Sequence, residues 1–194
     1  LAALLVERID PDGILLLLNK DSGSVRLYDP TSYKVLAEIP TGNKEKANGT
    51  SFPQELFPIP GSPKIYVSLA GNEGDYAIGV LDRTQPAAGV VKFIKVPVAL
   101  GDPDGKPEPA GFYFCKSKLY VALQDYTLSG TTVTYRPGRI GIIDPANDSF
   151  EGTIQLQGQN PGSITALDAN VCETVLVADG GQLTTVADGT SGLE

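Results

Sequence analysis

Three carboxylates lie close together in one short segment of the chain, at Asp102, Asp104 and Glu108. Prolines and a glycine separate them, which is typical of a turn. Carboxylate oxygens are ligands that Ca²⁺ prefers, so this segment is a candidate calcium site. It is far from a full EF-hand loop, and a solvated acidic loop is the simpler interpretation. We therefore expect no cofactor, with calcium as the alternative.

The sequence contains a repeating pattern of short strands, which is described below. Further acidic and amide side chains recur just after the second strand of this repeat. Such a set would project from one end of the fold and could bind a cation or a sugar. Asx and Gly residues also form turns without binding anything, so a purely structural role is the alternative. The candidate binding residues are Asp21, Asn72, Glu73, Asp75 and Asp179.

One long insertion holds a cluster of aromatic and cationic residues, Tyr126, Tyr135 and Arg136. Tyrosine and arginine are common anchors of protein interfaces, because they bury a large area and offer hydrogen bonds. We predict that these three residues belong to a binding surface.

Histidine is absent from the sequence. Its absence excludes Ser-His-Asp and Cys-His catalysis, histidine general bases and histidine metal ligands. The remaining polar residues form no recognisable catalytic cluster in the sequence. We therefore predict no catalytic residues and favour a non-catalytic protein over an enzyme.

The two cysteines, Cys115 and Cys172, each come just before a recurrent strand. Equivalent positions in adjacent repeats can come near each other, so a disulfide between them is one prediction. Two buried free thiols are the alternative. A disulfide would imply an oxidising compartment.

The composition is that of a folded, acidic protein. The 194 residues are 41% hydrophobic, which is enough for a sizeable core, and the formal net charge is −8. An acidic surface repels phosphate backbones, so nucleic acid is not an expected partner. The charge can equally serve only to keep the chain in solution. No apolar run reaches the roughly 20 residues that a membrane-spanning helix needs.

The elements that carry these residues are short strands in a repeating order. In each repeat, one strand of alternating apolar and polar residues ends with an aspartate. Another strand precedes it in the chain, and a tight turn comes before that other strand. The four aspartates are Asp29, Asp82, Asp144 and Asp188. The unit has four strands, here called A to D, joined by local connections. Four such strands form one antiparallel sheet, and stacking copies around an axis buries both faces.

We therefore predict an all-β β-propeller of four-stranded antiparallel blades. Its 194 residues form one propeller segment of about three and two-thirds blades, at 1–42, 53–98, 110–157 and 162–194. Closed propellers usually have 4–8 blades. We expect further blades from the same or another chain to complete the ring, because Glu194 falls where a fourth outer strand is expected.

The pattern resembles the YVTN-type β-propeller repeat family, which includes bacterial surface-layer and periplasmic proteins. The residues that carry the resemblance are Asp10-Pro-Asp-Gly13, Val25–Asp29, Ile39-Pro-Thr-Gly42, Tyr66-Val67, Tyr120-Val121, Ile140–Asp144 and Asn160-Pro-Gly162. The resemblance implies a repeat protein in the periplasm, on the cell surface or secreted. It leaves the activity open, because one fold hosts several functions.

We expect a non-catalytic extracytoplasmic module for protein or ligand binding or for assembly. The long loops at 42–52, 101–109 and 124–138 are predicted to lie on one face, which is then the binding face. Neutral drift in surface loops is the alternative explanation of their length. The resemblance also implies two other functions, a lactonase-like hydrolase with or without Ca²⁺ and a scaffold beside a redox centre.

Overall fold

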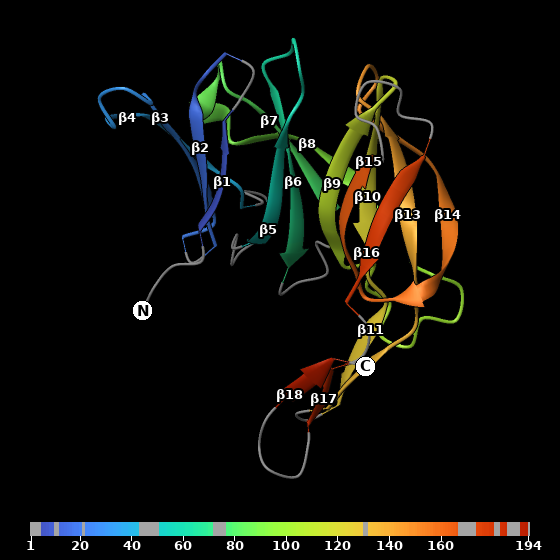
Figure 1. Cartoon of the computed structure of the whole chain (residues 1–194). Helices are drawn as coiled ribbons and strands as arrows, with labels where there is room; N and C mark the ends of the chain where they lie inside the picture. The colour runs from blue at the N-terminus through green and yellow to red at the C-terminus, as the bar shows by residue number, and fades with distance from the viewer. Residues whose placement is uncertain are drawn as a thin grey trace. The chain divides into compact units, whose positions relative to one another are not determined.

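We describe a computed structural model of the chain, shown in Figure 1. The structure describes residues 5–9, 12–20, 22–42, 51–71, 77–129, 132–166, 174–180, 183–185 and 191–193. The chain divides into two compact units, Leu1–Lys95 with Pro145–Ser149, and Val96–Asp144 with Phe150–Glu194. Among the described residues, no helix is long and apolar enough to cross a membrane.

The first unit holds two four-stranded antiparallel sheets, each with its strands in chain order (Figure 1). A short 3-10 helix, η1 (Pro86–Ala88), precedes the last strand. The strands of the first sheet are β1 (Leu5–Ile9), β2 (Leu15–Asn19), β3 (Ser24–Tyr28) and β4 (Val35–Pro40). Those of the second are β5 (Ser51–Pro58), β6 (Lys64–Gly71), β7 (Ala77–Asp82) and β8 (Val90–Lys95).

Alternation in the sequence explains why these segments pair as strands. Successive side chains of a strand point to opposite faces, so every second residue can be buried. In β2 the buried positions are Leu16 and Leu18, both with no exposed area. They join one apolar core with Leu56 and Ile65 of the second sheet. Burial of aliphatic side chains between the two sheets is therefore what holds the first unit together.

The turn Pro145–Ser149 belongs to the first unit, where it contacts β6. The ammonium of Lys64 lies 2.8 Å from the Asp148 carboxylate and also donates to the Pro145 carbonyl. The hydroxyl of Tyr66, which has no exposed area, donates to the same carboxylate. Asp148 thus satisfies two buried or half-buried donors of one strand.

The second unit holds one four-stranded antiparallel sheet and three two-stranded ones. The four strands are β9 (Pro109–Cys115), β10 (Lys118–Leu123), β13 (Pro137–Asp144) and β14 (Ser149–Gln159). The two-stranded sheets are β11 (Tyr126–Ser129) with β12 (Thr132–Tyr135), β15 (Pro161–Ala166) with β16 (Val175–Asp179), and β17 (Leu183–Thr185) with β18 (Ser191–Leu193). Ala122, Ile140 and Ile164 form a core that joins the four-stranded sheet to β15.

Lys116 and Ser117 make the turn between β9 and β10. Both have positive φ, at 46° and 64°, as a two-residue hairpin turn of type I′ requires. The turn follows Cys115, which is 4% exposed and takes part in a disulfide bond. Cys172 lies outside the described residues.

The prediction of an all-β chain built from four-stranded antiparallel sheets is confirmed. Two predicted details need correction. The segment Gln124–Gly138 was expected to be a loop, but most of it is the hairpin β11–β12. In the fourth repeat, β17 pairs with β18 rather than extending the β15–β16 sheet within the described residues. Asp188, which was predicted to end the corresponding strand, lies outside them.

Candidate functional site

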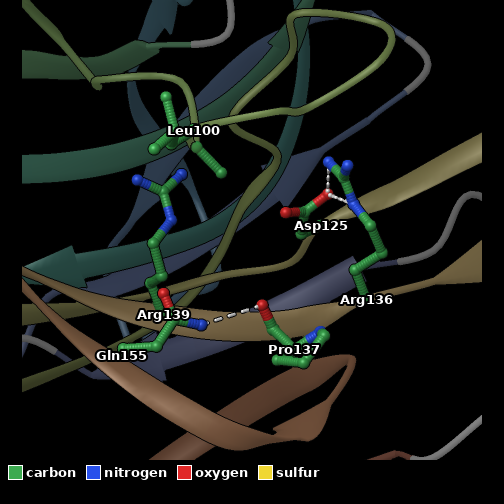
Figure 2. A pocket seen from close by; sticks show the side chains of 7 residues that line it. Leu100, Asp125, Arg136, Pro137, Arg139 and Gln155 are labelled. Atoms are coloured by element: carbon green, nitrogen blue, oxygen red, sulfur yellow. Dashed lines mark hydrogen bonds and ion pairs between the residues drawn. The ribbon is translucent and has the colours of Figure 1, made fainter.

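A cavity of about 240 Å³ lies in the second unit, at the base of the hairpin β11–β12 (Figure 2). Three parts of the unit supply its walls: the connection that follows β8, the two ends of the hairpin, and the neighbouring strands β13 and β14. The lining residues are Ala99, Leu100, Asp125, Arg136, Pro137, Arg139 and Gln155.

The hairpin register places Asp125 and Arg136 side by side. Tyr126 pairs with Tyr135, so the residues just outside this pair also face each other. The Arg136 backbone N–H donates to the Asp125 carbonyl at 2.8 Å, which closes the base of the hairpin. The two tyrosine rings pack at 5.7 Å between centroids with a tilt of 59°. Such a tilted arrangement is favourable for aromatic pairs.

Arg136 joins the hairpin to the acidic segment that was predicted as a calcium candidate. Its Nε atom donates to Oδ1 of Asp125 at 2.9 Å, and its Nη2 atom lies 3.0 Å from Oδ1 of Asp102. Nη1 donates to the Gly101 carbonyl. The hydrogen bond to Asp125, followed by the charges of Asp125 and Asp102, raises the pKa of Arg136. All three nitrogens of this guanidinium are therefore engaged.

Asp102 is almost completely buried, with 1% of its side chain exposed. Besides Arg136, its Oδ1 atom accepts from the Asp104 backbone N–H at 3.2 Å, which forms a local turn. Its Oδ2 atom makes no hydrogen bond to any described residue. Burial, with the nearby charge of Asp102 as a smaller contribution, raises the pKa of Asp104.

Glu108 lies between two prolines, has a positive φ of 31° and is only 3% exposed. Neither carboxylate oxygen makes a hydrogen bond within the described part of the chain. Burial raises the pKa of Glu108 to about 9, and the charges of Asp104, Asp102 and Asp125 add to the increase. The Tyr126 backbone N–H lowers this pKa slightly, although its geometry falls short of a hydrogen bond. At neutral pH the side chain is therefore protonated.

Arg139 is the second cation of the same cluster and is buried, with 7% exposed, on strand β13. Its Nε and Nη2 atoms have no hydrogen-bond partner among the residues that the structure describes. Burial lowers its pKa, and the charges of Asp125, Asp102 and Glu108 partly offset this effect. Arg139 and the Asp125–Arg136 pair line the same cavity (Figure 2).

The calcium prediction for Asp102, Asp104 and Glu108 can now be compared with the geometry. Asp102 and Asp104 contribute to the raised pKa of Glu108, so the three carboxylates share one electrostatic neighbourhood. However, the described residues contain no group of three Cys, Asp or Glu side chains that could hold a metal ion. The arrangement is a buried cluster of acids and arginines.

The other predicted binding residues fall into three groups. Tyr126, Tyr135 and Arg136 come together at the hairpin base, as described above. Asp179 ends β16, where it pairs with Pro161, and its carboxylate fills the space that a side chain at Gly158 would occupy. Asp21, Asn72, Glu73 and Asp75 lie outside the described residues.

Sequence reasoning missed Asp125 and Arg139. The available signal for Arg139 is a charge directly before the apolar residues Ile140–Ile143, at a position where alternation predicts burial. No such signal exists for Asp125, because its importance depends on the hairpin that brings Arg136 to it.

No family model and no curated protein matches the chain. Solved structures do match, and they share the β-propeller architecture. Hydrazine synthase from Kuenenia stuttgartiensis is 18% identical with a TM-score of 0.59, and the match covers 94% of this chain and 52% of that one. The β-propeller domain of Cps50 (Swd1) from Myceliophteria thermophila is 14% identical with a TM-score of 0.59, covering 97% and 54%.

The chain therefore has a β-propeller fold. Virginiamycin B lyase from Staphylococcus aureus, determined with quinupristin, is a third match at 14% identity and a TM-score of 0.55, covering 96% of this chain and 53% of the lyase. The present propeller thus spans about half the length of these structures. At such low identity the similarity shows the fold alone. The resemblance to the YVTN-type family remains a prediction.

Proposed function

We propose that this propeller is a non-catalytic, extracytoplasmic module that binds a protein partner through the loop face of its second unit. One observation carries the proposal. Arg136 joins the 101–109 segment to the hairpin β11–β12, so that two long insertions form one ordered surface rather than two separate loops. Ordered insertions on a rigid scaffold are a common way to build a binding surface.

The composition of the hairpin supports a protein partner. Residues opposite each other in an antiparallel pair project from the same face, so the two faces can be read from the register. One face carries Tyr126, Leu128, Val133 and Tyr135. The other carries Thr127, Ser129, Thr132 and Thr134. None of these eight side chains is charged, and Leu128 is 64% exposed. Depletion of charge and enrichment in tyrosine are typical of interface centres.

The disulfide of Cys115 supports the extracytoplasmic part of the proposal. Disulfides persist in oxidising compartments and are rare where thiols are kept reduced. An acidic chain with a net charge of −8 is also suited to basic protein surfaces, and it disfavours nucleic acid.

The test compares two variants that remove a similar exposed side chain from different strands. Leu128→Ser alters the hairpin, whereas Ile154→Ser alters β14, where Ile154 is 50% exposed. Each protein is immobilised and exposed to an extract of the source organism, and the bound proteins are quantified by mass spectrometry. We expect Leu128→Ser to lose the partner that wild type and Ile154→Ser both retain. An identical set of bound proteins for all three would contradict the proposal.

The proposal that the protein is not a catalyst has its own test. The purified chain is assayed against a panel of lactones and esters, with and without a chelator. We expect no turnover above that of a heat-denatured sample. Turnover that the chelator abolishes would overturn this part and favour a metal-dependent hydrolase.

A further inference from the structure

Strand β14, which has 11 residues and is the longest strand in the described part of the chain, lies at the edge of its sheet (Figure 1). It pairs with β13 on one side, and no described strand pairs with its other side. Such an open edge offers a row of backbone N–H and C=O groups to any second strand. Proteins usually protect an open edge with charged residues, with proline or by keeping the strand short.

Strands β4 and β8, which end the two sheets of the first unit, carry this protection. Each has six residues. β4 includes Glu38 and Pro40, and β8 includes Lys92 and Lys95. In β14 the only charged residue is Glu151, near the start of the strand. The open edge of β14 is therefore longer and less protected than those of β4 and β8.

The rest of β14, Gly152–Gln159, contains neither a charged residue nor a proline. The side chains of Thr153–Gln155 are exposed, and 50% of Ile154 is accessible to solvent. Threonine and isoleucine favour the extended backbone of a strand. Uncharged segments of this kind, without proline, readily accept a further strand. The segment is therefore a candidate surface for association by strand pairing.

The sequence of this segment is nearly symmetric about Gln155. Residues at equal distances before and after Gln155 match in size or polarity. The matched pairs are Ile154 with Leu156, Thr153 with Gln157, and Gly152 with Gly158. Two identical strands that run antiparallel about a two-fold axis at Gln155 place each residue opposite its match. No like charges face each other in this register, so nothing opposes the pairing electrostatically.

We propose that two copies of this chain associate through the open edges of β14, which pair in antiparallel order about a two-fold axis at Gln155. Ile154 of each copy then lies opposite Leu156 of the other copy, and the pairing buries part of their apolar area. A self-complementary segment is what an interface between identical chains requires, which favours a second copy over an unrelated strand. Each copy uses the same edge, so the association closes as a dimer.

The side chain at the centre of the segment leaves this edge accessible. Nε2 of Gln155 donates to the Pro137 carbonyl at 3.2 Å (Figure 2). It also donates to the Gly138 carbonyl at 3.0 Å. Both acceptors lie at the start of β13, so the amide is directed toward the neighbouring strand of its own sheet and away from the open edge.

Sedimentation equilibrium of the purified chain tests the proposal. We expect a reversible equilibrium between monomer and dimer without larger species. A wild-type chain that stays monomeric at about 1 mM would overturn the proposal, because the strands then do not associate measurably. Species larger than a dimer would also overturn it, because an interface that uses the same edge twice cannot continue.

Two double variants test the register. In the proposed dimer Thr153 of one copy lies opposite Gln157 of the other, with Cβ atoms about 4.5–5.5 Å apart. One variant combines Thr153→Lys with Gln157→Lys, and the other combines Thr153→Glu with Gln157→Glu. Each places like charges opposite each other twice, so dimer affinity should fall about tenfold or more. A mixture of the two variants pairs lysine with glutamate and should recover the dimer.

The matched control combines Leu36→Lys with Val91→Lys. It adds two lysines to β4 and β8 at positions that are 55% and 49% exposed, and it should dimerise as the wild type does. Thermal unfolding shows that each variant is folded. Unchanged dimerisation of both β14 variants would show that another surface is used. A mixture that fails to recover the dimer would contradict the register about Gln155. Either result overturns the proposal.

This inference is independent of the proposed protein partner, because β14 is not part of the hairpin β11–β12. Leu128→Ser should lose the partner and remain dimeric. Ile154→Ser should keep the partner and dimerise more weakly, because it removes an apolar contact of the paired strands. Partner capture and sedimentation of these two variants therefore show which of the two proposals fails.

Discussion

Arg136 lies 3.0 Å from Asp102, and this ion pair fastens a segment that precedes β9 to the hairpin that follows β10. The two residues are 34 positions apart in the chain. Asp125 accepts from the same guanidinium, so one cation neutralises two carboxylates that have 1% and 7% of their side chains exposed. The order of the proposed binding surface thus depends on a single arginine.

Replacing Arg136 with alanine should destabilise the protein. The change leaves two buried carboxylates without a counter-charge, and we expect a loss of about 2–3 kcal/mol in the free energy of unfolding. Urea unfolding measures it. The control is Arg26→Ala, which breaks an exposed pair with Glu38 and should cost clearly less, because solvent screens exposed ion pairs. Equal losses in the two variants would show that the ion pairs of Arg136 stabilise the protein no more than an exposed ion pair does.

Replacing Glu108 with glutamine should stabilise the protein in neutral and mildly alkaline solution. The pKa of Glu108 is raised from 4.5 to about 9 in the folded chain. Between these values the unfolded chain loses a proton that the folded chain keeps, so stability falls as the pH rises from about 4.5 to 9. Below this range both states are protonated and the contribution vanishes. The glutamine variant lacks the ionisable group and should lose this part of the pH dependence.

The measurement is the free energy of unfolding from pH 5 to 9.5. The sequence contains no histidine, so no histidine titration obscures this range. Glu38→Gln is the control: a hydrogen bond from Ser24 and the pairing with Arg26 lower the pKa of Glu38, so its contribution is lost only as the pH falls into the acid range. A wild-type curve parallel to that of Glu108→Gln would show that Glu108 ionises normally.

Much of the fold could be predicted because strands with one buried face leave a period of two in the sequence. The alternating strand that ends with Asp29 was predicted from the sequence, and the structure has β3 at Ser24–Tyr28, directly before this aspartate. The same rule applies to Thr132–Tyr135, which also alternates. It was interpreted as a loop because the four-strand repeat has no position for an additional hairpin.

The site was less predictable, since its properties come from burial rather than from residue type. Asp102 and Glu108 were recognisable as acidic, but nothing local indicates that both lose almost all contact with solvent. Glu108 is protonated because the fold buries it, and the charges of Asp104, Asp102 and Asp125 raise its pKa further. Arg139 likewise is recognisable as a buried cation only once β13 carries it into the interior of the second unit.

Replacing Asp148 with alanine should destabilise the first unit more than replacing it with asparagine. Asp148 has a φ of 51°, a region that Asp and Asn adopt far more readily than Ala. Asparagine also keeps an acceptor for the buried Tyr66 hydroxyl, whereas alanine leaves it without this bond. We expect about 1–3 kcal/mol for Asp148→Ala and a smaller loss for Asp148→Asn. Thermal unfolding of the two variants shows which of them is less stable. Equal losses would mean that the charge opposite Lys64 is the dominant contribution.

Replacing Gly111 with alanine should test how β9 and β15 approach each other in the second unit. A Cβ atom at Gly111 would lie 2.2 Å from the Gly162 carbonyl oxygen, which is a backbone atom and cannot rotate away. One strand must therefore shift, and we expect a loss of about 1–3 kcal/mol or more. Gly152→Ala on β14 is the matched control, because nothing lies within 4 Å of the added atom. Removing this glycine should be neutral or stabilise by up to about 1 kcal/mol. If Gly111→Ala unfolds at the same urea concentration as Gly152→Ala, the two strands do not pack at this distance, and the contact between the third and fourth repeats is looser than described.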